Sequence, residues 1–177
     1  SALAGAPTLH AQHPKSPVFK DYKPPDSSIG IQQSDATYQL WQGFMVARKA
    51  NAGDPLAEHE LGIRYLTGKG FEPDTVKAVY WIRRAADHNV ITAKYNLGLL
   101  LSNGWGVEWN PFEAYPHFLY AAEHSMAQAR YVMGQLLIEN LVVSRDWTQA
   151  YHWVKLAADS GFTPAVEALA RFEQRAH

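Results

Sequence analysis

The side chains in this sequence that could do chemistry are histidines, serines and carboxylates, because the chain has no cysteine. His88 and His124 stand 36 residues apart, which suggests a paired metal site or an acid–base pair. A zinc site needs third and fourth ligands, and no residue supplies them at a recognisable spacing. Imidazolium groups are also stabilised by the dipole at helix C-termini, which is the simpler explanation. His10 and His13 lack further ligands in the same way.

No serine or histidine stands in a nucleophile elbow or another known catalytic signature. Glycine-rich stretches at residues 68–70 and 104–106 could suggest phosphate binding, but neither has the lysine–threonine ending of a nucleotide loop. Glycines that end one helix and allow a turn towards the next explain both stretches better. The sequence therefore predicts no catalytic residue, no cofactor and no metal, and indicates a protein without enzyme activity.

Composition narrows the classes of partner. The 177 residues include 16 basic and 17 acidic side chains, for a formal net charge of -1. Such a chain lacks the broad positive surface that binds nucleic acid or anionic membranes. Its apolar fraction of 47% is typical of a folded soluble protein, and no apolar run reaches the roughly 20 residues that span a bilayer. Recognition of a protein surface through shape and aromatic contacts is the expected mode of binding.

The sequence repeats every 36 residues, and the repeated segments must position any binding residue. When the sequence is aligned with itself at a shift of 36 residues, no insertion or deletion is needed. The columns include Ala57, Ala93, Ala129 and Ala165, and also Asp74, Asn110 and Asp146. A fixed period of this length indicates stacked supersecondary units.

Each unit has the pattern of two helices, which we name helix A and helix B. Ala57, Leu61 and Tyr65 fall on one side of the first helix A at i, i+4 and i+8. The first helix B has small and apolar residues at the spacing of a buried stripe. Asp74 directly precedes it and is expected to accept hydrogen bonds from its free amides as an N-cap.

The prediction for the whole chain is an all-α solenoid of about three helical hairpins with a half repeat at each end, preceded by an irregular arm. The first 25 residues hold five of the ten prolines and show neither helical nor strand periodicity. We place the arm at residues 1–33 and the repeat domain at 34–177. The expected elements of the domain are a capping helix at 36–52, repeats at about 54–89, 90–125 and 126–161, and a closing helix at 163–176.

The second unit carries the residues of a family resemblance. It contains Ala93-Lys94-Tyr95-Asn96-Leu97-Gly98, then Gly104-Trp105-Gly106-Val107, Asn110, Glu113-Ala114 and Ala121-Ala122. This pattern resembles the Sel1-like repeat, a relative of the tetratricopeptide repeat, and the resemblance covers about residues 37–175. It implies a right-handed α/α superhelix that binds other proteins and assembles complexes. Many bacterial members of this family resemble secreted or periplasmic adaptors.

Some positions depart from the family pattern. In the third unit Asn140 and Val142 stand where the inter-helix loop of the family has glycines. A β-branched valine tolerates a left-handed backbone poorly, so we expect a different turn there. Pro116 falls inside the second helix B, where it costs a hydrogen bond and predicts a kink. His117 replaces a tryptophan of the other two units, and the disulfides of some family branches are absent from this cysteine-free chain.

Tryptophans near the inter-helix connections form the first candidate binding site. Trp105, Trp109 and Trp147 lie in or beside these connections, where a solenoid exposes one edge. Large exposed aromatics are favoured at recognition sites because they bury much area at modest entropic cost. The alternative is structural, since a tryptophan before a helix cap can fold back onto the next turn.

A column on the helix A surface forms the second candidate. His59, Tyr95 and Tyr131 fall on one side of three successive A helices, a position that lines the groove of repeat proteins. Here too a structural alternative stands beside binding, because tyrosine rings at this position can pack between adjacent A helices.

The arm carries apolar residues among its prolines, namely Val18, Phe19, Tyr22 and Ile29-Gly30-Ile31. Two interpretations stay open: the arm lies along the solenoid or docks on another copy to give a homo-oligomer, or it is a disordered tether. Ala2-Leu3-Ala4 resembles the small-residue end of a secretory signal peptide. We therefore expect a periplasmic or secreted protein, with a cytoplasmic location as the alternative.

The sequence favours a non-catalytic adaptor or scaffold that binds a protein or peptide through the solenoid groove or the loop-edge aromatics, in a bacterial cell-envelope assembly. The alternative is an accessory module that binds cell-wall glycan or peptide, including one with hydrolase activity.

Overall fold

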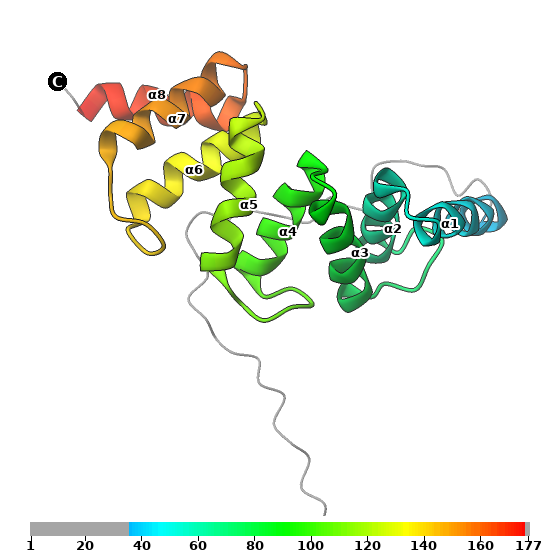
Figure 1. Ribbon diagram of the computed structural model, residues 1–177. Helices are drawn as coiled ribbons and strands as arrows, with labels where there is room; N and C mark the ends of the chain where they lie inside the picture. The colour runs from blue at the N-terminus through cyan, green and yellow to red at the C-terminus, as the bar shows by residue number, and fades with distance from the viewer. Residues whose placement is uncertain (1–35, 176–177) are drawn as a thin grey trace, which may run out of the picture.

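A computed structural model describes residues 36–175, and every regular element in this part of the chain is an α-helix. The helices are α1 (Ala36–Asn51), α2 (Pro55–Thr67), α3 (Thr75–Asp87), α4 (Ile91–Asn103), α5 (Pro111–Glu123), α6 (Ala127–Glu139), α7 (Trp147–Asp159) and α8 (Thr163–Arg175). Figure 1 shows them following one another along an elongated stack, which confirms the predicted all-α solenoid. The expected arm, with its apolar residues, lies outside the described residues.

Three hairpins form the centre of the stack, and each helix packs mainly against the helix before it and the helix after it. Helices α2, α4 and α6 are the predicted A helices, and α3, α5 and α7 are the B helices that follow them. Helix α1 packs on α2 as a preceding helix B would, and α8 closes the stack as a further helix A. Stability in such a stack comes from each hairpin and its contacts with its neighbours.

Helix starts follow the predicted caps. The carboxylates of Asp74 and Asp146 accept from the backbone amides of the third residue on, each at 2.9 Å. Asn110 does the same at 3.1 Å before α5, which begins with Pro111. Because these side chains satisfy amides that have no partner inside the helix, they fix where each helix B begins.

The core depends on a close approach of the two helices in each hairpin. Gly62, Gly98 and Gly134 recur on the A helices where Ile82, Phe118 and Val154 of the B helices press against them. A Cβ at Gly98 would lie 2.7 Å from the Phe118 ring, and one at Gly62 or Gly134 would lie 2.5 Å from its aliphatic neighbour. Any larger side chain at these glycines would push the helices apart.

The turns between helix A and helix B differ in the third repeat, as predicted. Gly68, Gly104 and Asn140 end the A helices with the same left-handed backbone. Two residues on, the first and second repeats have a second left-handed glycine, but Val142 of the third has no positive φ. The Asn140 side chain instead accepts from the Arg145 amide at 2.9 Å. In the second repeat, α5 continues through Pro116 to its end at Glu123.

Exchange of Gly106 for alanine tests how tightly successive repeats pack. Gly106 has φ +67°, and a Cβ there would collide with the backbone carbonyl of Thr75 in the preceding helix B. Gly161 has φ +79° but nothing within 4 Å of its Cβ position. We expect Gly161→Ala to lower the free energy of unfolding by about 1 kcal/mol through backbone strain alone. Gly106→Ala should cost about 1–3 kcal/mol more because of the collision. Urea unfolding measures the free energy of unfolding of both variants. Equal losses of stability in Gly106→Ala and Gly161→Ala would contradict this packing.

Candidate partner-binding surfaces

Two of the three predicted tryptophans are partly covered. Trp105 is half-buried and packs against the main hydrophobic core. Trp109 is half-buried too, with its Cβ 3.3 Å from the position that a Cβ on Gly104 would take. Trp147, the first residue of α7, is 51% exposed, and the guanidinium of Arg145 lies 5.7 Å from its ring centroid. Of the loop-edge aromatics, Trp147 therefore offers the most surface to a partner.

The predicted helix A column is built into the stack. Tyr95 meets the ring of Phe118 edge-on, with 5.8 Å between centroids, and Tyr131 meets Phe162 in the same way at 5.6 Å. His59 is also half-buried, and its Nε2 lies 2.9 Å from Nδ2 of Asn96 in the next helix A. These contacts correspond to the packing alternative raised for this column.

Burial lowers the pKa of His59 below its ordinary value of 6.5, although the nearby Glu60 carboxylate acts in the opposite direction. An amide nitrogen only donates, so the contact with Asn96 needs an unprotonated ring nitrogen. Burial also lowers the pKa of His117, and the charge of Lys94 adds to this effect. Both histidines are therefore favoured in their neutral form inside the fold.

The two histidines that stand one repeat apart, His88 and His124, lie at the ends of helices. His88 and His124 both lie at exposed C-terminal ends of B helices. The His124 ring stacks on Tyr120 with centroids 4.0 Å apart, and its Nδ1 lies 2.8 Å from the Tyr120 carbonyl oxygen. Within residues 36–175, no group of three or more His, Asp or Glu side chains is placed to hold a metal ion. No helix in the same range is long and apolar enough to cross a membrane.

An ion pair between a buried carboxylate and a partly exposed guanidinium joins the helices of the first repeat. The Glu58 carboxylate is fully buried, and Arg84 Nη2 approaches its Oε1 to 2.7 Å. The same guanidinium lies 5.1 Å from the centroid of the Trp81 ring. One period on, Lys94 lies 4.7 Å from the Tyr120 ring centroid. A cation thus bridges helix A and helix B in both repeats, which indicates a structural role for the pair.

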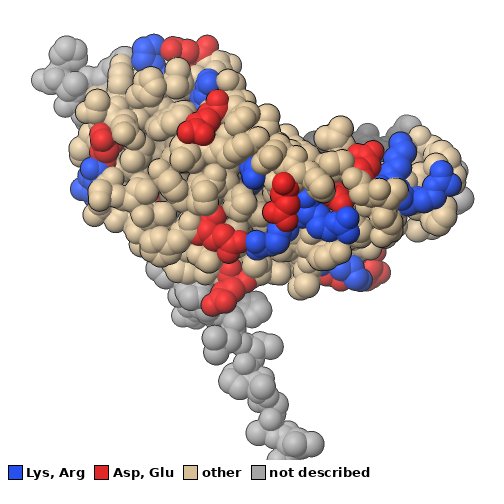
Figure 2. Space-filling view, viewed as in Figure 1, with Lys and Arg blue, Asp and Glu red and all other residues tan. Residues whose placement is uncertain are grey.

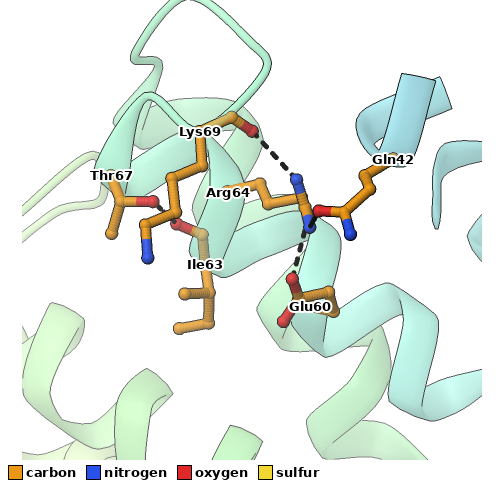
Figure 3. Close-up of polar contacts among 6 residues, drawn as sticks. All are labelled: Gln42, Glu60, Ile63, Arg64, Thr67 and Lys69. Carbon is orange, nitrogen blue, oxygen red and sulfur yellow. Dashed lines mark hydrogen bonds and ion pairs between the residues drawn. The ribbon is translucent and has the colours of Figure 1, made fainter. Parts of the chain in front are cut away.

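Arg64 forms a second polar cluster, which ties α1 to the first repeat. Figure 3 shows its guanidinium between Glu60, Gln42 and the loop at Lys69. Nε donates to Glu60 Oε1 at 2.8 Å, and the two terminal nitrogens donate to Gln42 Oε1 and the Lys69 carbonyl, each at 3.3 Å. The next two repeats have leucines at this position. Arg64 is therefore an adaptation to the end of the stack.

A surface that the sequence analysis missed runs along the outside of the B helices. Large apolar side chains that are 55% to 66% exposed recur on α1, α3 and α5. We call this surface the B-helix stripe: Leu40, Phe44, Val76, Tyr80 and Phe112. Leu40, Val76 and Phe112 stand one period apart, as do Phe44 and Tyr80. The 36-residue spacing of large apolar residues was therefore the feature of the sequence that could have revealed this surface. Their exposure could not be read from residue type.

Charge is spread over the surface instead of gathered in one patch. Figure 2 shows basic and acidic side chains interspersed over the end that holds α1 to α3, with wide areas free of charged residues elsewhere on that face. One cross-repeat pair joins α3 to α5, where Arg83 Nη1 lies 2.5 Å from Glu113 Oε1. This distribution agrees with the near-neutral net charge.

Tandem hairpins on a fixed period, with a small-residue column between their helices, define a helical-repeat protein of the tetratricopeptide-related class. The chain belongs to the Sel1 repeat family, whose repeat model matches residues 55–90, 91–126 and 127–162. Sel1 repeats generally mediate protein interactions and are typically non-catalytic.

Two solved structures share this fold. A Sel1 repeat protein from Oxalobacter formigenes is 26% identical, with a TM-score of 0.68 over 78% of this chain. The protein c5321, described as a protective antigen of uropathogenic Escherichia coli with an SLR fold, is 29% identical, with a TM-score of 0.72 over 80% of this chain. The chain covers 62% and 34% of the length of these two proteins, respectively. Comparison with curated proteins gives no match.

The lowered pKa of His59 predicts a pH dependence of stability. Between the ordinary value of 6.5 and the lower folded value, the unfolded chain holds a proton that the folded chain does not. The free energy of unfolding should therefore fall as the pH drops through about 6.5. His59→Gln should make this fall shallower, whereas His152→Gln, at an exposed position on α7, should leave it unchanged. Urea titrations at pH 7.5 and 5.5 compare the three proteins, and an equally steep fall in all of them would contradict the prediction.

Proposed function

We propose that this chain is a non-catalytic adaptor that binds a protein partner along the B-helix stripe. Exposed apolar side chains that occur singly need no explanation, but the stripe repeats on three successive B helices. Covering one such side chain stabilises a complex by about 1.5–3 kcal/mol before the costs of association. Of the features described, this repeated exposure is the one that best supports binding.

Polar groups beside the stripe support the proposal that the partner is a protein. Next to Tyr80, Arg84 donates from Nη1 to the tyrosine hydroxyl at 3.3 Å, and its guanidinium lies 5.8 Å from the ring centroid. The ion pair of Arg83 with Glu113 lies between α3 and α5. An apolar centre with a polar rim is the usual composition of a protein interface. Trp147 is proposed as a further contact at the far end of the B helices.

A cell-envelope setting is part of the proposal. The E. coli protein of similar fold is described as a protective antigen. That description is the observation that supports our proposal of an exported location for this chain. The adaptor would then assemble with a partner on the same side of the membrane.

Photo-crosslinking from the stripe tests the proposal. A benzophenone amino acid replaces Tyr80 or Phe112 in the full chain, and Glu123, an exposed residue at the end of α5, serves as the control position. The protein is incubated with envelope and soluble fractions of the source cells kept separate. We expect the same protein to be crosslinked from both stripe positions and not from the control, in the envelope fraction.

Affinity for the captured partner gives the quantitative test. Val76→Ser with Tyr80→Ser should weaken binding at least about tenfold, which corresponds to 1.4 kcal/mol. Val166→Ser, a change of the same type at an exposed position on α8, should have no effect. Both variants should stay folded at the assay temperature, which circular dichroism checks, since Val76, Tyr80 and Val166 are all exposed. Unchanged affinity of the double variant, or binding to purified wall glycan with no protein present, would contradict the proposal.

A further inference from the structure

We propose that the C-terminal end of the stack binds a loop of a protein partner in which a glycine precedes an apolar residue. The site is the C-terminal aromatic cluster, which we define as Trp147 and Tyr151 of α7 with Phe172 of α8. These helices lie at one end of the stack (Figure 1). Phe172 meets the other two rings edge-on, each with 6.2 Å between centroids. The inference rests on the proposed function, because it assumes a protein partner, and it names the part of that partner which this end of the stack takes.

In the earlier part of the stack, the loop of each repeat meets the first turn of the preceding helix B. A Cβ at Gly70 would collide with the backbone carbonyl of Gln39 in α1, and a Cβ at Gly106 would collide with that of Thr75 in α3. Both glycines have a positive φ, and they stand one period apart, as do Gln39 and Thr75. A loop whose closest residue has no side chain therefore fits the start of a helix B.

The apolar residue after each glycine covers the next turn of the same helix B. Phe71 lies against Gly43 of α1, where a Cβ would come within 2.9 Å of its ring. One period on, Val107 packs against the main hydrophobic core, which contains Val79 of α3 at 7% exposure. The loop thus contributes a glycine and an apolar side chain to two successive turns of the helix before it.

Trp147 and Tyr151 occupy these two positions on α7, but they are open. They stand one period after Pro111 and Tyr115 of α5. Pro111 is buried, and Tyr115 is partly buried against the main core. Trp147 and Tyr151 are 51% and 37% exposed. Within residues 36–175, no loop follows α8 to cover them.

The residue types at the two ends of the stack differ. Gln42, Lys49 and Arg64 near the N-terminal end stand in columns that have alanine or leucine in the following repeats. Such polar residues suit the end of a repeat stack, which faces solvent. At the C-terminal end, Trp147 and Phe172 are aromatic in columns where the earlier repeats have no aromatic residue. Exposed aromatic residues in place of a polar end indicate a surface that a partner covers.

A second copy of the chain is a poor source of the loop. Gly70 and Phe71 are already in contact with α1 of their own chain. Gly106 is in contact with α3, and Val107 packs against the core. Because these loops would have to leave their own stack to reach another copy, the loop is assigned to a different protein.

Charge at the cluster indicates a third feature of the partner loop. The guanidinium of Arg145 lies 5.7 Å from the centroid of the Trp147 ring, and no carboxylate in the described residues forms an ion pair with it. In the first two repeats, a glutamate follows the apolar residue of the loop, namely Glu72 and Glu108. An acidic residue at this place in a partner loop complements the positive charge of Arg145.

A peptide with the sequence of residues 68–74 is the probe, because it contains a glycine, an apolar residue and a glutamate in this order. It is cyclised through a short glycine spacer, labelled with a trifluoroacetyl group on its lysine and titrated with the full chain by fluorine NMR. We expect saturable binding to the full chain. Phe71→Ser or Gly70→Val in the peptide should each weaken binding at least about tenfold, through lost apolar burial or through the unfavourable left-handed backbone of valine.

Variants of the full chain locate the site. Trp147→Ser and Tyr151→Ser should each weaken peptide binding at least about fivefold. The double change Val76→Ser with Tyr80→Ser on the B-helix stripe should leave it unchanged, as should Leu56→Ser at an exposed position on α2. Circular dichroism checks that each variant keeps its helices.

Three results would overturn the inference: no peptide binding to the full chain, equal binding of the Phe71→Ser peptide, or binding that survives both changes in the aromatic cluster. None of these results bears on the crosslinking from Tyr80 and Phe112. Conversely, loss of that crosslinking with intact peptide binding would refute the stripe and leave the C-terminal site standing.

Discussion

The close approach of the two helices within each hairpin is the constraint on which the rest of the structure depends. At Gly62, Gly98 and Gly134, helix A has no side chain, and the large apolar residue of helix B lies directly against its backbone. This contact allows the two helices to approach closely in all three repeats. The caps then fix where each helix B begins, and the hairpins follow one another on the 36-residue period.

A stack built from nearest-neighbour contacts must change at its ends. The first repeat replaces a buried leucine of the later repeats by Arg64, which reaches Gln42 of α1 and the loop at Lys69. A guanidinium suits this place because it is long enough to join three elements through separate donors. The repeat sequence is thus kept where hairpins meet hairpins and altered where the stack meets its terminal helix.

Much of the fold could be predicted because its determinants are local or periodic. Asp74, Asn110 and Asp146 are caps for reasons contained in a few neighbouring residues, and the 36-residue period made every hairpin visible several times. The turn at Val142 was predictable in the same way, since the left-handed backbone excludes a β-branched side chain.

The exposure of individual apolar side chains could not be predicted from the sequence. Trp105 and Trp147 occupy similar places beside helix connections, yet one packs against the core and the other is half exposed, because different elements lie next to them. Leu40 and Phe112 have the residue types of a core and lie on the outer surface. Whether an apolar residue is covered depends on the neighbouring helices, and the sequence specifies those neighbours only through the complete fold.

The packing of the central A helices explains why the outer surface of the B helices is the better candidate for binding. Along α4, Leu97, Leu99, Leu100 and Leu101 are all buried, so this helix is covered on nearly every side. In α6, Val132 is buried, and Tyr131 meets the ring of Phe162 edge-on. A partner entering the groove would have to displace contacts that hold the repeats together, at a cost in stability. On the B helices the apolar groups are already exposed, and a partner that covers them gains their burial without disturbing the stack.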